Sequence, residues 1–507
     1  MKTFLHIFSL FMVVLLANNL QAQEQIIIEP GAAGVLNQAI DNVANQGKIL
    51  VLRRGFPYLL TGEVGNSGFK LHIKAEDGDG PRPIIIFAPA SGGAAVDQLF
   101  RPRADITLEG LHLTNRDLLG GITERIIRAS ADSIVIKMDN CLVDDSGQAA
   151  FRLDGKDNRV YITNSIFSRI GVPSNPDNGR IVDDRGNQID TLWIENSLIY
   201  NITSRIIRDG GGAITYFRFN QNTVANIAQR GFEVGEVEEM IFTNNIIANG
   251  AFLGRQFSLD PEEDDSERVI LSAALTRSGN EKWTISHNNF FRDSLVVNAT
   301  PAQQADGDTI VQTLNFSTDV LAIIDSLGLG ATNIEENLVF AAPVPFSFDF
   351  ISKHHAGDTG NALPWDHSSL TPNPLYSAIG AMVPRYDMSH DYGYSATTVS
   401  YRAGTEGQPI GTDIFGFSDI SSTKNLFVEN NILFFPNPVS DELYIQNLDA
   451  EVITFVRVFD LQGKLMQATK VDHQNLILPV NQFNNGIYIL TITDQKGNIS
   501  ARKFVKQ

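Results

Sequence analysis

A short pattern of apolar and polar positions recurs along the chain between Ile106 and Phe291. Each copy has alternating apolar residues, then a polar pair usually led by Asn, then two further apolar residues. Alternation with period two, together with many β-branched and aromatic residues, is typical of β-strands. A period of roughly 20–50 residues indicates a repeat architecture in which stacked units share one core. The equivalent polar positions are Gly110, Asn140, Asn164, Asn196, Gln221, Asn244 and Asn288, separated by 30, 24, 32, 25, 23 and 44 residues.

The Asn positions favour a right-handed parallel β-helix. Asn tolerates a left-handed φ and can bond to its own backbone, which suits a sharp bend between two strands. On stacked coils, such amides can also bond to one another in a ladder. A leucine-rich repeat would need a regular Leu skeleton and a helical half, and the sequence has neither. The uneven steps place loops of different size at one corner of the coils, where solenoids build binding faces.

The N-terminal part of the chain predicts a cap followed by the first coils. Residues 34–46 have apolar residues at helical spacing, and Gly47 is a stop signal. A helix here would shield the open edge of the first coil. Strands are predicted at Lys48–Leu52, Lys70–Ile73 and Ile84–Phe87.

A second set of strands, several of which begin with Arg, lies between the copies of the pattern. Arg152, Arg208 and Glu233 each follow an equivalent turn position by 12 residues, so they should stack on successive coils about 4.8 Å apart. Asp183 joins them once the loop 171–179 is assigned to its longer step. The sequence therefore predicts one outward column of charges, formed by Arg128, Arg152, Asp183, Arg208 and Glu233.

Such a column suits an anionic sugar polymer. An Arg fork binds a carboxylate or sulfate through two hydrogen bonds, and adjacent coils can contact successive parts of an extended chain. In β-elimination a cation neutralises the uronate carboxylate while a base removes the neighbouring proton, whereas hydrolysis uses paired carboxylates. The catalytic candidates are Arg152, Arg208, Asp183 and Glu233, and the substrate-binding candidates are Arg128, Arg185, Asp209 and Arg230.

A structural interpretation competes with this one. Alternating Arg, Asp and Glu can simply pair across neighbouring strands and keep a sheet face solvated. The Asn turn positions are interpreted as structural, and Trp193, Tyr216 and Phe217 as core or sheet-face residues in preference to sugar platforms.

Charge and metal-ligand patterns narrow the function further. The net charge of −19 argues against nucleic acid as a partner, because phosphate binding relies on clustered Lys and Arg. The acidic segment 260–267 could hold Ca²⁺, the one cofactor that the sequence brings into consideration, but its spacing is not that of an EF-hand and a solvated loop is preferred. His354, His355 and His367 have no fixed ligand spacing, so no metal site is predicted.

The two ends of the chain differ from the repeats. Residues 1–22 have Lys2, an apolar run and a small-residue end, which predicts a secretory signal peptide. No later segment reaches 18 uninterrupted apolar residues, so no transmembrane segment is expected in the mature chain. The single cysteine, Cys141, is expected to be a buried thiol. A monomer is expected.

The C-terminal part predicts a separate domain. The body is expected at 23–416, a polar linker at 417–430 and a small domain at 431–507. Alternating short strands with Gly and Asn turns in the last segment predict a β-sandwich. The expected fold class is therefore all-β: a right-handed parallel β-helix with an N-terminal capping helix, followed by a small C-terminal β-sandwich.

The last domain resembles the type A C-terminal sorting domain of the Bacteroidetes type IX secretion system. The resemblance covers residues 434–507 and rests on Pro436-Asn-Pro438, Asp460-Leu-Gln-Gly-Lys464, Gly486-Ile-Tyr488 and the basic terminal strand. It implies export across the outer membrane by that machinery, with removal of the tail, to the medium or the outer cell surface.

The body resembles the pectate-lyase-like β-helix superfamily, and within it the chondroitinase-B-like and uncharacterised β-helix proteins of Bacteroidetes. Known lyases of this type use a Lys base, an Arg, and Ca²⁺ held by Asn and Glu. The column supplies arginines, while Lys137 and Lys156 lie at different rungs. The sequence thus predicts a secreted protein that engages an anionic polysaccharide, with lyase the preferred enzyme class. A non-catalytic glycan-binding or adhesive protein and a glycoside hydrolase remain the alternatives.

Overall fold

The computed structural model divides the chain into two compact units, Met1–Phe417 and Ser418–Gln507, each with its own hydrophobic core. The residues that it describes are 23–88, 97–117, 121–172, 178–257, 269–276, 279, 281–302, 307, 309–344, 348–357, 390–415, 432–447, 453–460, 465–473, 475–494 and 499–507.

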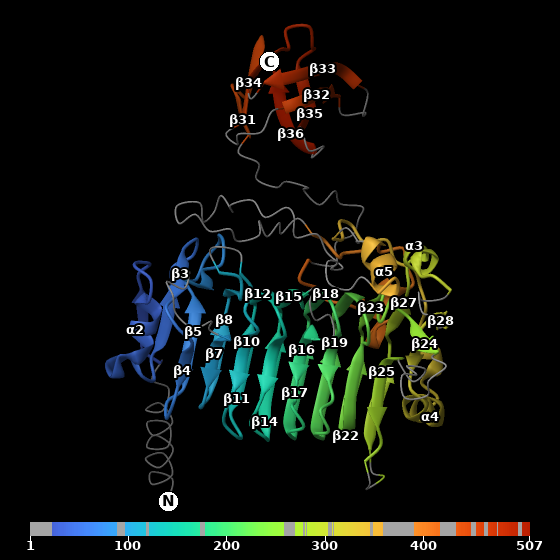
Figure 1. Cartoon of the computed structure of the whole chain (residues 1–507). Helices are drawn as coiled ribbons and strands as arrows, with labels where there is room; N and C mark the ends of the chain where they lie inside the picture. The colour runs from blue at the N-terminus through green and yellow to red at the C-terminus, as the bar shows by residue number, and fades with distance from the viewer. Residues whose placement is uncertain are drawn as a thin grey trace, which may run out of the picture. The chain divides into compact units, whose positions relative to one another are not determined.

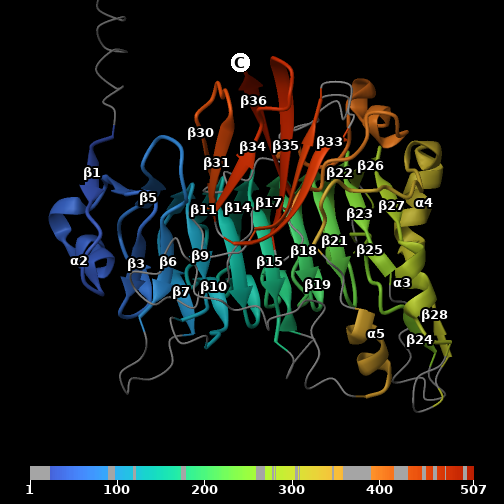
Figure 2. The same ribbon diagram turned by 90° about the horizontal axis from the view of Figure 1, so that it is seen from above.

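The first unit is a parallel β-helix, which confirms the expected fold class. Each coil crosses three sheets, called C, A and B here, and every strand pairs in parallel with the equivalent strand of the next coil. Figures 1 and 2 show the coils following one another along a single axis, from the blue N-terminal end to the yellow end.

Sheets A and B meet at the bend predicted from the Asn positions. Sheet A contains β1 Gln25–Ile28, β2 Ile49–Leu52, β5 Leu71–Ala75, β8 Ile106–Glu109, β11 Val135–Asp139, β14 Asn158–Thr163, β17 Ile189–Glu195, β20 Ile214–Asn220, the second part of β22 Phe232–Thr243, and β26 Lys282–Ser286. Sheet B contains β3 Pro57–Leu60, β6 Ile84–Phe87, β9 His112–Thr114, β12 Leu142–Ser146, β15 Ile166–Ile170, β18 Leu198–Ile202, β21 Thr223–Ile227, β23 Ile246–Ala248 and β27 Asn289–Phe291.

Sheet C carries the second set of predicted strands. It contains β4 Val64–Asn66, β7 Gln98–Pro102, β10 Arg125–Ala129, β13 Ala149–Leu153, β16 Arg180–Asp183, β19 Arg205–Arg208, the first part of β22, β25 Val269–Ala274 and β29 Leu314–Phe316. One of its columns is fully buried and faces the core. That inner column is Phe100, Ile127, Phe151, Val182, Ile207 and Phe232, so the residue that follows each of them faces outward.

One residue with positive φ makes the bend between sheets A and B in each of seven coils. The residues are Gly110, Asn140, Asn164, Asn196, Gln221, Asn244 and His287, with φ between 47° and 68°. The last one corrects the sequence alignment: Thr243 pairs with Ser286, which places His287 rather than Asn288 in the bend. The predicted amide ladder is present at one step, where Asn196 Nδ2 donates to Asn164 Oδ1 at 2.7 Å.

A second ladder of side chains lies one residue further along and is largely buried. In it, the backbone N–H of one coil donates to the side chain of the next coil. Asn222 N donates to Asn245 Oδ1 at 2.9 Å, and Asn245 N donates to Asn288 Oδ1 at 3.0 Å. These bonds satisfy N–H groups at the bend that would otherwise be buried without an acceptor. This buried turn ladder consists of Ser165, Ser197, Asn222, Asn245, Asn288 and Asn333.

Helices cover both ends of the solenoid. At the N-terminal end, α2 Val35–Asp41 buries Leu36 and Ile40 in the main core, as the predicted cap requires. At the other end, α4 Thr318–Ser326 buries Val320 and Ile324 in the same core. The remaining elements of this unit are α3 Ser294–Ala299, α5 Phe348–His355, the antiparallel pair β24 Arg255–Phe257 and β28 Thr309–Val311, and short 3-10 turns at Val43–Asn45, Gly330–Thr332, Ser400–Arg402 and Thr405–Gly407.

A C-terminal segment of the first unit covers the outer face of sheet B. Leu338, Tyr392, Tyr394 and Ile410 pack in one buried cluster with outward residues of that sheet, which include Tyr200. Sheet B is therefore covered along its later coils, whereas the charged column faces outward from sheet C.

The second unit consists of two antiparallel sheets around one core, as the β-sandwich prediction requires. One sheet orders β30 Ile432–Phe435, β31 Glu442–Asn447 and β34 Asn475–Pro479. The other orders β33 Leu465–His473, β32 Ile453–Phe459, β35 Gly486–Asp494 and β36 Ile499–Lys506.

Several sequence predictions fall outside the described residues: the signal peptide 1–22, the acidic segment 260–267, His367 and the linker 417–430. Cys141 is described, and its thiol is fully buried, as expected; burial raises its pKa to about 12. Among the described helices, none is both long and apolar enough to cross a membrane.

Replacing Asn245 by Ala tests the buried turn ladder. Asn245 Oδ1 accepts from Asn222 N, and Asn245 Nδ2 donates to Phe219 O at 2.9 Å, so the variant leaves two backbone groups of the preceding coil without this hydrogen-bond partner. We expect the free energy of unfolding to fall by about 2–4 kcal/mol, measured by denaturant titration.

The matched control is Asn298→Ala on the exposed surface of α3, which should change stability by less than about 0.5 kcal/mol. Equal effects of the two variants would show that the ladder contributes nothing of its own.

Candidate functional site

The register of sheet C places the predicted charges in one column. Arg128 pairs with Arg152, Arg152 with Asp183, and Asp183 with Arg208. Ile207 pairs with Phe232, so the next residues, Arg208 and Glu233, are equivalent as well. The column therefore runs over five consecutive coils, and its spacing is about 4.8 Å per coil.

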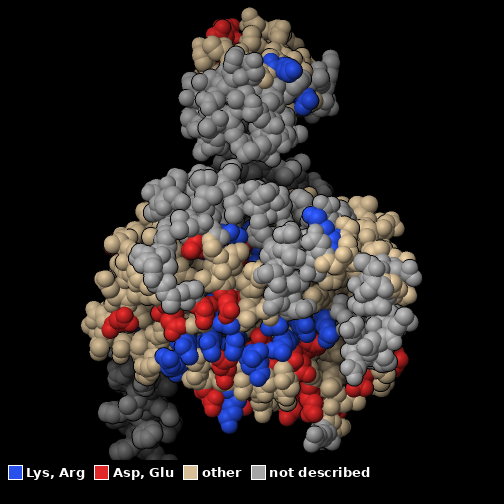
Figure 3. Space-filling view, in the orientation of Figure 1, with Lys and Arg blue, Asp and Glu red and all other residues tan. Residues whose placement is uncertain are grey.

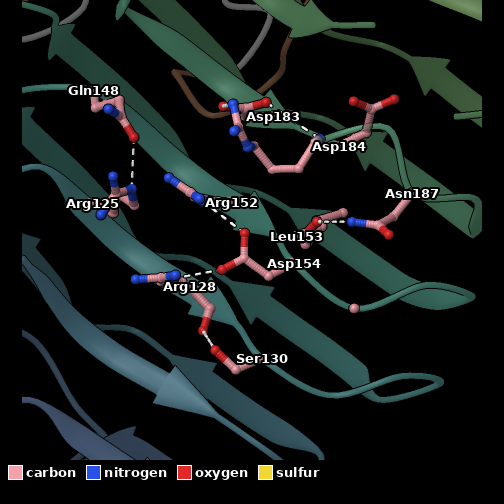
Figure 4. A network of polar contacts seen from close by, with 12 residues as sticks. Arg125, Arg128, Ser130, Gln148, Arg152, Leu153, Asp154, Asp183, Asp184 and Asn187 are labelled. Carbon is pink, nitrogen blue, oxygen red and sulfur yellow. Dashed lines mark hydrogen bonds and ion pairs between the residues drawn. The ribbon is translucent and has the colours of Figure 1, made fainter. Parts of the chain in front are cut away.

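Arginines in this column share carboxylates. Asp154, which follows β13, accepts from Arg128 Nε at 2.6 Å and from Arg152 Nε at 2.7 Å. Figure 4 shows Asp154 between these two guanidinium groups. Burial opposes ionisation of Asp154, but the hydrogen bonds and charges of Arg152 and Arg128 outweigh it and lower the pKa of this carboxyl. Sequence analysis did not assign Asp154, because it lies just beyond the strand.

Asp183 is buried beneath the arginines around it. Its side chain is 1% exposed, and it contacts Arg180 and Arg208 at 3.1 Å each and Arg185 at 3.9 Å. A carboxylate enclosed by three guanidinium groups holds those cations in place. Asp183 therefore keeps the place in the column that was predicted, but arginine side chains cover it.

Glu233 has a similar arrangement one coil after Arg208. It forms ion pairs with Arg205 and with Arg230, and its side chain is 22% exposed. Three carboxylates, Asp154, Asp183 and Glu233, therefore each join at least two arginines. In these contacts seven arginines share three carboxylates, so the arginines of the column are in excess of the carboxylates that join them.

Figure 3 shows a band of Lys and Arg side chains across the β-helix, with Asp and Glu beside it. Sheet C itself contributes Arg101, Arg128, Arg152 and Arg208, whose side chains are between 19% and 32% exposed. Guanidinium groups at this spacing can bind successive anionic groups of an extended polymer.

Two further carboxylates lie where sheet C ends and the chain turns toward sheet A. Asp184 follows Asp183, and Asp209 follows Arg208, so they are equivalent positions on adjacent coils. Asp184 Oδ1 accepts from Gly186 N at 3.0 Å and from Gly210 N at 2.7 Å. Asp209 Oδ1 accepts from Gly211 N at 2.6 Å. Asp209 was predicted as a substrate-binding residue, whereas Asp184 was not singled out.

Asp184 is the most strongly perturbed carboxyl beside the column. Burial raises its pKa to about 6, against the opposing effect of the two backbone N–H bonds, and the negative charges of Asp209 and Asp183 add to the rise. Raised carboxyl pKa values occur at catalytic acids. In the sequence, the Asp183-Asp184 pair followed by Gly186 is the signal that could have singled out Asp184. The rise of its pKa, however, comes from burial, which the sequence does not show.

No group of three or more His, Cys, Asp or Glu side chains within the described ranges is arranged to hold a metal ion. His354 and His355 both lie at the end of α5, where His355 is buried. Both histidines lie on α5, and neither belongs to the charged column of sheet C.

Comparisons with known proteins gave two matches to this chain. Residues 433–507 match the family model of the secretion system C-terminal sorting domain. The protein is therefore secreted, to the cell surface or outside it, by the type IX route that the tail resembled.

A region of the chain is similar to a polysaccharide-degrading enzyme. It is 24% identical over 288 residues to a funoran endo-beta-hydrolase from Wenyingzhuangia aestuarii, covering 48% of this chain and 37% of that protein. The chain thus spans well under half the length of the relative.

Replacing Asp183 by Asn tests its supporting position. The neighbouring Arg180 side chain is 9% exposed, so removal of the negative charge takes an ion-pair partner from a largely buried guanidinium. We expect a loss of about 3 kcal/mol in the free energy of unfolding. Glu233→Gln, where the charge is more exposed, should cost less; an equal or smaller loss for Asp183→Asn would contradict this arrangement.

Replacing Asp184 by Asn tests the raised pKa. Since the folded pKa of about 6 exceeds the ordinary value of 3.8, the stabilising contribution of Asp184 is present at low pH and is lost as the pH rises through about 6. The variant should therefore have a Tm higher than the wild type by a few degrees near pH 8, with the difference vanishing near pH 4. Asp190→Asn, on the exposed face of β17, is the matched control and should show no such pH dependence.

Proposed function

We propose that this secreted protein binds an anionic polysaccharide along the outer face of sheet C and cleaves it by hydrolysis. The observation that carries the proposal is the column of arginines, aligned over consecutive coils and in excess of the carboxylates that join them. In a chain of net charge −19, such a local excess favours a polyanion over a neutral ligand.

The arginines take the binding role. Arg128, Arg152 and Arg208 can each present N–H donors to a carboxylate or sulfate, because a guanidinium has five donors and the ion pairs use only some of them. Arg185 and Arg230, with side chains 40% and 35% exposed, extend the same surface. Within this proposal, Asp183 and Glu233 hold the arginines in place.

Hydrolysis is favoured over β-elimination by two observations. The strands of sheet C carry no lysine that could serve as the base of a lyase, and the similar enzyme is named a hydrolase. Carboxylates, in contrast, are present on several coils beside the column. β-Elimination remains the competing chemistry that the experiment below distinguishes.

A second candidate function is non-catalytic glycan binding. It is favoured by the pairing of the column arginines with neighbouring carboxylates, which is the arrangement of a stable, solvated sheet face. Such a protein would bind the same polymers without cleaving them.

The purified protein should be incubated with sulfated, carboxylated and neutral polysaccharides. We expect new reducing ends from at least one anionic polymer, without the ultraviolet absorbance of unsaturated uronates. New reducing ends together with that absorbance would identify a lyase, and binding without new ends on any polymer would support the second candidate.

Arg152→Ala and Arg208→Ala should each weaken binding of the anionic polymer about tenfold in calorimetry, since each removes a charged donor. Arg159→Ala, exposed on sheet A, removes the same charge from another face and should leave the affinity unchanged. Equal weakening by all three variants would mean that only net charge matters.

A further inference from the structure

The corner between sheets C and A contains a pair of carboxyl groups with a fixed offset. Asp184 and Asp209 directly follow Asp183 and Arg208, which pair in register, so the two residues occupy the same place on adjacent coils. Each Oδ1 accepts a short hydrogen bond from the backbone of a glycine two residues later in the chain, Gly186 and Gly211 respectively. This bond is common to both residues, and Asp184 Oδ1 accepts a second one from Gly210 N at 2.7 Å.

Glycines on the following coils make room for both groups. A Cβ placed on Gly210 would lie 2.6 Å from Asp184 Oδ1, and one on Gly235 would lie 2.8 Å from the Asp209 carboxyl carbon. Each carboxyl group therefore overlies the glycine of the next coil. Because Gly210 and Gly235 are themselves one coil apart, the two carboxyl groups are offset by one coil, about 4.8 Å.

That offset has a chemical meaning for a glycosidase. Retaining glycosidases hold their two carboxyl groups about 5–5.5 Å apart, whereas inverting ones need about 6.5–9.5 Å to admit a water molecule. By contrast, Asp183 and Glu233 are separated by two coils and are enclosed by arginines. The pair at the corner fits the shorter separation.

The two carboxyl groups also differ in environment, as an acid and a nucleophile must. Asp184 is 3% exposed, whereas Asp209 is half-buried. Burial and the nearby Asp209 charge favour the protonated form of Asp184. Within the described part of the chain, no hydrogen bond reaches Oδ2 of either residue.

We propose that Asp184 is the general acid and Asp209 the nucleophile of a retaining glycoside hydrolase. This inference rests on the proposed function and names the residues that would perform it. The arginine column lies on the same coils, with Arg208 next to Asp209 and Arg185 next to Asp184. An anionic chain bound along the column would therefore pass beside the pair.

The reaction proceeds in two displacement steps. First, the Asp209 carboxylate forms a bond to the anomeric carbon while the glycosidic bond breaks, and Asp184 gives its proton to the departing sugar oxygen. Then the Asp184 carboxylate takes a proton from water, whose oxygen bonds to the anomeric carbon and releases Asp209. The enzyme is restored, and the product keeps the configuration of the substrate.

Asp184→Asn and Asp209→Asn test the pair. Asn keeps the Oδ1 acceptor for the glycine N–H groups but cannot act as a carboxylic acid or carboxylate. On the polymer that the wild type cleaves, we expect each variant to lose about a thousandfold in kcat, with calorimetric binding retained within about threefold. Asp190→Asn, exposed on sheet A, should keep full activity.

Two further readouts distinguish catalysis from folding. The wild-type rate should fall as the pH rises through the pKa of the acid, and NMR of the first product should show the anomeric configuration of the substrate. Near-wild-type cleavage by either variant would overturn the assignment while leaving the hydrolase standing, and an inverted product would overturn the role of Asp209. Binding without cleavage by the wild type would overturn hydrolysis itself, and this pair with it.

Discussion

Stacking of equivalent residues at one strand spacing is the constraint on which the rest of this β-helix depends. Each coil is held to the next by parallel strand pairs, and the bend between sheets A and B interrupts them. The buried turn ladder restores the missing acceptors, since Asn222, Asn245 and Asn288 each accept the backbone N–H of the preceding coil. The backbone N–H groups of the bend are thereby hydrogen-bonded. The strands of sheet C pair in register, and side chains that are far apart in sequence lie next to one another there.

The same stacking creates an electrostatic problem on sheet C. Arginines at equivalent positions lie about 4.8 Å apart and repel one another. The protein answers with carboxylates that each join two or more arginines, such as Asp154 between Arg128 and Arg152. This arrangement lets a dense row of cations exist on a folded sheet, and a bound polyanion would relieve the remaining repulsion.

The corner beside this row holds a carboxyl group whose ionised form is disfavoured by burial. Asp184 is buried close to two other carboxyl groups, and its raised pKa shows that the ionised form is unfavourable there. Glycines at 186, 210 and 235 leave space at this corner that any larger residue would fill. A folded protein gains no stability from an ionised carboxylate in that position.

The sequence by itself determined the repeat, the strand faces, most of the Asn bends and the membership of the charged column, because alternation and the 12-residue spacing found in three coils can be recognised without knowledge of packing. It also identified the sorting tail, whose motifs are local. Tertiary structure alone decided that Asp183 lies beneath three arginines, that Asp154 joins Arg128 to Arg152, and that His287 takes the last bend. It also decided the offset and the burial of Asp184 and Asp209, because these depend on which glycine of the next coil lies under each side chain.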